Sequence, residues 1–198
     1  ILAMLMSPWV GKNVGKIDAR KLATISFLGF ALVMWMRSRF NTDTDFESIL
    51  IPTVLQGAAM AFFFIPLQTL VFSGLPPERM PDAAGLSNFV RIFAGGVGVS
   101  IYTTLWESRA VLHHANLAAT INRGNQTATQ TLSQLGAAGN NPEQALAMVN
   151  RLIDQQAYTM AATDLFYLSS ALFVVLITLI WFTRPGKDMH GAEAGGAH

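Results

Sequence analysis

An arginine inside a long apolar run is the residue of this sequence most able to do chemistry. Arg91 lies between residues 83 and 106, a stretch with no other charged side chain, and Asn88 precedes it by about one helical turn. A cation at membrane depth costs roughly 2.5–3.5 kcal/mol on insertion scales. Two interpretations stay open. Arg91 either snorkels or bonds a helix end, or it lines a transport cavity together with Asn88.

A second set of polar residues lies in a run without charges. Gln56 and Gln68 both fall between residues 49 and 75. Their separation turns an α-helix through about 120° beyond whole turns, so we do not expect both to face one point of a cavity. Phe62 and Phe63 lie between them. These rings could line an aromatic pocket for apolar or cationic compounds, or they could face lipid.

The sequence carries no motif of an enzyme class, and we expect neither a cofactor nor a metal ion. It contains no phosphate-binding loop, no H-E-x-x-H pattern and no G-x-S-x-G pattern. It has no cysteine, which excludes disulfides, thiolate nucleophiles and cysteine-based metal sites. His113 and His114 are adjacent and diverge by about 100° on a helix, so we expect surface residues near a membrane boundary.

The composition is that of a membrane protein. Of 198 residues, 52% are hydrophobic and 13% are charged, against about 25% charged in soluble domains. The net charge of +1 offers no basic surface to nucleic acid. Because a membrane-crossing helix needs about 20 mostly apolar residues, we predict an all-α membrane protein with four complete transmembrane helices and the end of a fifth. The predicted helices cover residues 22–38, 49–75, 83–106 and 158–183, with the partial one at 1–10.

The connecting segments suggest an orientation and a missing beginning. Residues 11–21 are the most basic segment, which places them in the cytoplasm by the positive-inside tendency. Alternation then makes residues 107–157 a long periplasmic loop and 184–198 a disordered cytoplasmic tail. Within the loop, 121–141 is expected to be a polar connector. A short helix is predicted at 142–156, and its apolar face would carry Leu146, Val149 and Ile153. Since the chain opens on an apolar run, we expect the C-terminal piece of a longer protein.

Small residues follow Arg91 at a spacing of four. Small side chains at this spacing let two helix backbones approach closely in lipid. We therefore predict a helix-packing contact, which could also be the contact about which a transporter rocks. The residues concerned are Ala94, Gly95, Gly96, Gly98 and Ser100.

The stretch from Phe62 to Trp106 resembles fourteen-helix drug:proton antiporters of the EmrB/QacA type, in the major facilitator superfamily. The segments SGLPPER and LSNFVR carry the resemblance in that order and spacing, and further matches run from SPWVGK to LIWFTRP. The resemblance implies a fragment of a major-facilitator bundle, the C-terminal half of such a transporter. It also implies that the proton-coupling groups belong to an N-terminal half that this sequence does not contain.

Two segments match known motifs of that family in part. The segment GKNVGKIDARKL is similar to a cytoplasmic loop motif, with Gly11, Lys16, Arg20 and Lys21 in place and Asp18 where the motif has glycine. The segment PTVLQG is similar to a motif of the first half, with Gln56 and Gly57 kept. Thr53 stands where that motif has arginine.

The resemblance implies proton-driven efflux of apolar or amphipathic compounds by alternating access. It also implies small apolar or cationic substrates, protons and the lipid bilayer as partners. The long outer loop is similar to that of members that export through a periplasmic adaptor and an outer-membrane channel. Two alternatives stay open. The same fold could export a siderophore, lipid or fatty acid, or the chain could be a noncatalytic membrane scaffold subunit.

Overall fold

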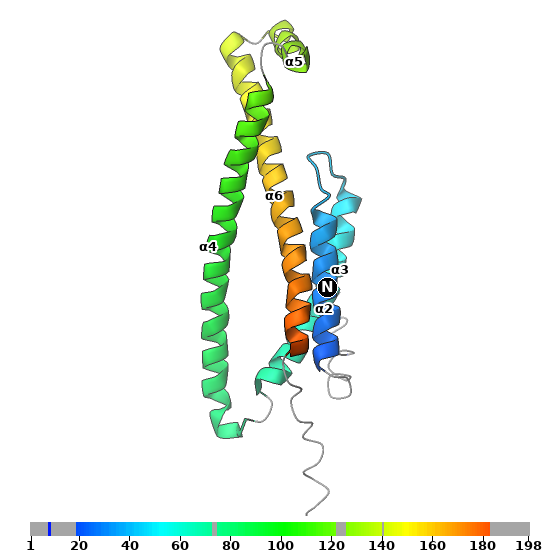
Figure 1. The fold of residues 1–198 in the computed structure, drawn as a ribbon, viewed down its shortest axis with the longest axis vertical. Helices are drawn as coiled ribbons and strands as arrows, with labels where there is room; N and C mark the ends of the chain where they lie inside the picture. Colours follow the sequence, from blue (N-terminus) through cyan, green and yellow to red (C-terminus); the bar gives the residue numbers. More distant parts are fainter. Residues whose placement is uncertain (1–7, 9–18, 73–74, 122–125, 140, 183–198) are drawn as a thin grey trace, which may run out of the picture.

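The computed structural model is built from α-helices (Figure 1). It describes Pro8 and residues 19–72, 75–121, 126–139 and 141–182. In chain order the elements are α2 (Ala19–Arg37), α3 (Phe46–Phe72), the 3-10 helix η1 (Pro77–Arg79), α4 (Met80–Thr120), α5 (Gln126–Ala137) and α6 (Pro142–Phe182). The part of the chain that the structure describes contains no strand, and the prediction of an all-α membrane protein is confirmed.

Helices α4 and α6 are much longer than a bilayer is thick. Each has 41 residues, about 60 Å at a rise of 1.5 Å per residue, against about 30 Å of apolar bilayer. The loop expected at residues 107–157 is therefore mostly helix, and α5 occupies part of the expected polar connector. Polarity marks where a helix leaves the membrane, whereas a helix ends only at a cap, a proline or a glycine.

The beginning of α6 shows such a cap. The Asn141 side-chain oxygen accepts the Gln144 backbone N–H at 2.8 Å, and the Gln144 side-chain oxygen accepts the Asn141 backbone N–H at 3.1 Å. This reciprocal pair satisfies two backbone donors that the first helical turn would leave unpaired. From Pro142 the helix runs without a break through residue 157, so the expected short helix and the expected span are one element.

Helix α2 packs against both α3 and α6, and α6 lies between α2 and α4 (Figure 1). Leu22, Ser26 and Val33 of α2 are fully buried. Four phenylalanine rings join α2, α3 and α6, with centroids between 5.2 and 6.0 Å apart. They are Phe27 and Phe30 of α2, Phe63 of α3 and Phe173 of α6.

Two serines fasten the neighbouring backbones to α2. The Ser26 hydroxyl donates to the Ala59 carbonyl of α3 at 2.9 Å, and the Ser170 hydroxyl of α6 donates to the Ala31 carbonyl at 2.8 Å. Next to the first bond, a Cβ added at Gly29 would lie 3.0 Å from the Ala59 Cβ. The missing side chain at Gly29 thus allows the close approach that helices in lipid use for association.

Three of the described helices are long and apolar enough to cross a membrane, within Phe46–Phe64, Pro77–Thr120 and Pro142–Phe182. Helix α2 is not one of them, because its apolar run between Lys21 and Arg37 has roughly 15 residues, or about 22 Å. A short run can still cross if its flanking cations snorkel. The span predicted at residues 22–38 therefore exists as a helix, while its crossing of the membrane stays a prediction.

Gly29→Leu should weaken the α2–α3 contact, because the new side chain would collide with Ala59 and separate Ser26 from its acceptor. We expect a fall of several degrees in the melting temperature of the purified protein, in line with the roughly 1–3 kcal/mol typical of overpacking. Gly136→Leu is the matched control, since a Cβ at Gly136 of α5 meets nothing within 4 Å. Equal melting temperatures for the two variants would contradict the close contact.

Candidate functional site

Arg91 and Asn88 lie together on α4. The Arg91 guanidinium donates to the Asn88 side-chain oxygen at 2.6 Å, and both side chains are exposed. No carboxylate of the described residues lies within ion-pair distance of Arg91. On the same part of the helix, the rings of Phe89 and Phe93 stack with centroids 6.1 Å apart. The structure thus pairs the two predicted polar residues and places them on an uncovered helix surface.

That surface belongs to the half of α4 that leaves its neighbours. Near residue 110, α4 packs on α6 through Ala110, and towards its beginning the two helices separate (Figure 1). The small residues predicted to make a helix contact all lie on the separated half and are exposed: Ala94, Gly95, Gly96, Gly98 and Ser100. Within the described residues, a Cβ added at any of the three glycines of this set meets nothing within 4 Å.

Gln56 meets an arginine that the sequence analysis did not connect with it. Arg37, the last residue of α2, donates through one guanidinium nitrogen to the Gln56 side-chain oxygen at 2.8 Å and to the Thr53 hydroxyl at 3.5 Å. The Thr53 hydroxyl in turn donates to the Ile49 carbonyl at 2.7 Å, which fixes its orientation. A cation from α2 therefore reaches the position where the similar family motif has an arginine on α3 itself.

The other predicted pathway residues of α3 do not gather around Gln56. Phe63 packs within the ring cluster and also contacts Phe64, with centroids 5.4 Å apart, so it fills the bundle interior. Phe62 is half-buried, and Gln68 is exposed. Gln68 lies about 18 Å further along the helix axis than Gln56, which separates the two amides by height as well as by direction.

Most of the predicted cytoplasmic loop motif lies outside the described residues. This applies to Gly11, Lys16 and Asp18. Arg20 and Lys21 belong to the first turn of α2, where Arg20 is half-buried and Lys21 is exposed. The Arg20 carbonyl accepts the Thr24 hydroxyl at 2.8 Å.

Two histidine–aspartate pairs join α4 to α6, a feature that the sequence analysis missed. His113 Nε2 lies 2.8 Å from Asp164 Oδ2, and His114 Nε2 lies 3.3 Å from Asp154 Oδ1. Arg109 approaches Asp164 at 3.9 Å. His113 is the less accessible histidine, with 16% of its side chain exposed. The pattern that could have revealed the pairs is helical: histidines on one long helix face carboxylates on its antiparallel neighbour.

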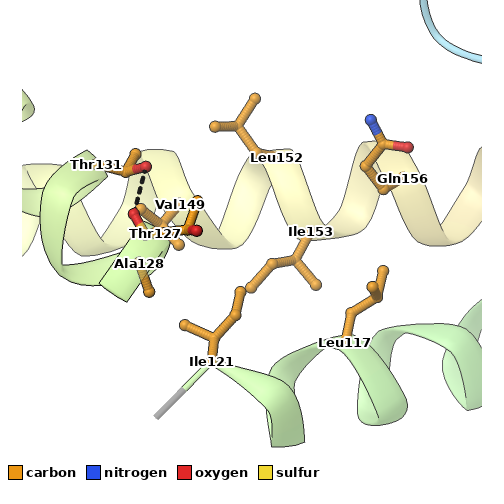
Figure 2. Close-up of a pocket in the computed structure, with 9 residues that line it drawn as sticks. All are labelled: Leu117, Ile121, Thr127, Ala128, Thr131, Val149, Leu152, Ile153 and Gln156. Atoms are coloured by element: carbon orange, nitrogen blue, oxygen red, sulfur yellow. Dashed lines mark hydrogen bonds between the residues drawn. The ribbon is translucent and has the colours of Figure 1, made fainter. Parts of the chain in front are cut away.

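The ends of α4, α5 and α6 enclose an apolar cavity of about 240 Å³. Figure 2 shows Ile121 and Leu117 of α4 pointing toward Ile153 of α6, with α5 covering the other side. Val149 and Ile153, two of the three apolar residues expected on the short helix, thus line their own hairpin. Leu146, the third, is 58% exposed.

Over its own whole length, the chain is similar to proteins whose names describe export or resistance. The chain is 39% identical over its whole length to the multidrug export protein EmrB of Escherichia coli strain K12. It is 38% identical over its whole length to the fatty acid resistance protein FarB of Neisseria gonorrhoeae. The colistin resistance protein EmrB of Acinetobacter baumannii is 24% identical over 94% of the chain. No protein-family model and no solved structure matches the chain.

The chain spans about two fifths of the length of these relatives, 39% of the Escherichia coli protein and 38% of FarB. Similarity along the entire chain agrees with the apolar helices that are long enough to span a membrane. The sequence is therefore that of a multi-pass protein of the bacterial inner membrane. The chain is thus a homologue, over its whole length, of export and resistance proteins of the EmrB type, and 60% of it is similar to an MFS-type transporter of Bacillus subtilis.

Proposed function

We propose that this chain takes part in proton-driven export of apolar or amphipathic compounds by alternating access. The observation that carries the proposal is the 39% identity, over the whole chain, with a multidrug export protein. The names of the relatives describe export and resistance, which favours a transporter over a scaffold subunit. The protons would be exchanged by groups outside this chain, as the family resemblance implies.

The uncovered half of α4 supports this proposal. Residues 86–101 are exposed apart from one half-buried serine, and large apolar side chains such as Phe89, Phe93 and Val99 are 64–68% exposed. Lipid can cover such a surface. Further helices can also cover it, if the whole transporter has the length of the relatives. In alternating access, one bundle rocks against another around a substrate near the membrane midplane. The small residues of this half give a partner helix room to slide closely past.

A second substrate class is fatty acids. The 38% identity with the fatty acid resistance protein FarB favours it as strongly as the first, because the two identities are nearly equal. Drugs and fatty acids share an apolar body with a polar or charged end. The two classes differ in the sign of that charge, and the cations within this chain are therefore the residues to examine.

The hairpin formed by the end of α4, α5 and the beginning of α6 fits a role outside the membrane. About half of each long helix extends beyond the apolar bilayer. We propose that the hairpin lies in the periplasm and contacts a periplasmic adaptor that leads to an outer-membrane channel. Met148 and Leu152, which lie one turn apart on α6 and are 46% and 54% exposed, are the apolar residues that such a partner would cover.

Export is tested by deleting the gene that encodes this chain and measuring the minimum inhibitory concentrations of several amphipathic drugs. Complementation with Arg91→Lys should restore part of the resistance, because the cation is kept. Arg91→Ala should leave resistance within about twofold of the deletion strain, because a charge at membrane depth is retained only where it has a function. Arg79→Ala, which removes an exposed cation of η1, is the control. Normal resistance with Arg91→Ala at normal expression would exclude a transport role for Arg91.

Two double variants distinguish contact with the adaptor from the stability of the hairpin itself. Met148→Ser with Leu152→Ser should reduce co-purification of the adaptor several-fold and leave folding intact, since both side chains are exposed. Val149→Ser with Ile153→Ser should instead lower the melting temperature, because each substitution removes the apolar contacts of a half-buried side chain, worth roughly 1 kcal/mol. If the exposed pair leaves adaptor recovery unchanged, the hairpin does not bind it through this surface.

The His113–Asp164 pair should stabilise the contact between α4 and α6. The two side chains lie 2.8 Å apart and join the helices by a hydrogen bond. A cycle of His113→Ala, Asp164→Ala and the double variant should give about 0.5–1 kcal/mol of coupling. Unfolding in mixed micelles measures it.

His114→Ala combined with Asp164→Ala is the control cycle, because His114 pairs with Asp154. Its coupling should be close to zero. A coupling close to zero for His113 with Asp164 as well would mean that their contact does not stabilise the helix pair.

A further inference from the structure

Arg37 is a cation drawn into the depth of an apolar span. Its guanidinium bonds Gln56, which lies ten residues after Phe46, the first residue of α3 and of the candidate span Phe46–Phe64. Ten residues correspond to about 15 Å along the helix axis. The Arg37 side chain thus extends towards α3. Because Arg37 is the last residue of its own helix, we would expect its side chain to snorkel to the membrane interface instead.

The partners of Arg37 are neutral. No carboxylate of the described residues lies within ion-pair distance of it. Other arginines of the described chain are engaged differently: Arg109 approaches Asp164 at 3.9 Å, and Arg39 lies over the Trp35 ring at 4.8 Å. An amide and a hydroxyl orient a guanidinium but leave its charge uncompensated. In a membrane span, such a charge marks a site of function.

The geometry of the contacts leaves most donors of Arg37 available. Both hydrogen bonds come from one terminal nitrogen, whereas a guanidinium carries five N–H groups in a fixed fork. The remaining donors match the two oxygens of a carboxylate or of a phosphate.

Apolar surface adjoins this cation. On α3, Ile49 lies one turn before Thr53 and Met60 lies one turn after Gln56, and they are 44% and 42% exposed. A ligand with an anionic head and an apolar tail could therefore place its head on Arg37 and its tail along α3. A cationic compound would be repelled at the same point.

We propose that Arg37, held by Gln56 and Thr53, binds the anionic head of an amphiphile. The site takes a carboxylate or phosphate on an apolar tail, either an exported fatty-acid-like compound or an anionic lipid of the membrane. The exported source rests on the proposed export function, and the binding itself does not. The sequence motif alone could not reveal the site, because its cation comes from a different helix from its two polar supports.

Binding is measured first, on the purified full protein in nanodiscs of phosphatidylcholine. The probe is a pyrene-labelled fatty acid, displaced by dodecanoate or by dodecanol, which have equal tails and differ in the charged head. Dodecanoate should compete at least about tenfold better, because charge-assisted hydrogen bonds to a guanidinium distinguish the heads. Equal competition by the two compounds would overturn the proposal, and this arm needs no variant.

Variants then assign the binding to Arg37. Arg37→Gln should weaken dodecanoate competition about tenfold and leave dodecanol unchanged, whereas Arg37→Lys should retain part of the preference, since it keeps the charge and loses the fork. Arg39→Gln is the matched control, because Arg39 is exposed, lies two residues away and is engaged with Trp35. Unchanged dodecanoate binding in a folded Arg37→Gln protein would overturn the proposal.

Two further arms distinguish the sources of the anion. If a lipid occupies the site, replacing phosphatidylcholine by phosphatidylglycerol in the nanodiscs should abolish dodecanoate binding to the unaltered protein. If an exported compound occupies it, cells with Arg37→Gln should lose resistance to fatty acids and keep resistance to cationic dyes. A strain without the gene that resists both compounds normally would contradict the export function alone, because the binding measurements stand independently of it.

Discussion

The free energy of an unpaired polar group in the apolar membrane is the constraint on which this structure depends. Helices satisfy their own backbones, so a bundle in lipid has few remaining ways to specify which helices touch. Here the side chains of Ser26 and Ser170 do so by donating to carbonyls of neighbouring helices. Each bond needs a close backbone approach, and Gly29 provides the space for the first. The same constraint explains why Arg37 bonds Gln56, a polar group on the part of α3 after Glu47, which carries no charged side chain.

A different set of contacts holds the two long helices together. The contact of α4 with α6 includes small apolar residues that are buried, namely Ala110 of α4 and Ala157 and Ala161 of α6. His113 and Asp164 add a polar connection beside them. Towards the other end of α4 these contacts stop and the helices separate (Figure 1). Helix α4 thus has one end that packs against α6 and another half whose surface the described residues leave uncovered.

Sequence predicted the fold class because it depends on composition and on apolar runs, which are local properties. The spans at residues 83–106 and 158–183 stay predictions, while α4 continues past residue 106 and α6 begins before residue 158. Residues 107–120 contain neither proline nor glycine that would end α4 earlier. The sequence analysis named Gln56 and Arg91 as polar residues of interest but missed Arg37 as the partner of Gln56. Nineteen residues and a turn separate that pair, and only the packing of α2 on α3 brings it together. Local patterns therefore identify the groups, while tertiary packing decides their partners.

The two membrane cations of this chain are built for different tasks. Arg91 bonds Asn88 on its own helix, within one turn, so its position moves with α4 and depends on no other element. Arg37 bonds across two helices, and Thr53 is itself fixed by the Ile49 carbonyl, so its guanidinium has a defined direction. Recognition of a planar anion requires that direction, because bidentate bonds lose strength rapidly when the fork turns. A helix that moves between conformations needs no such fixed direction, and its charge need only be tolerated in each conformation. The proposed binding of an anionic head thus suits Arg37, and the proposed rocking movement suits the helix that carries Arg91.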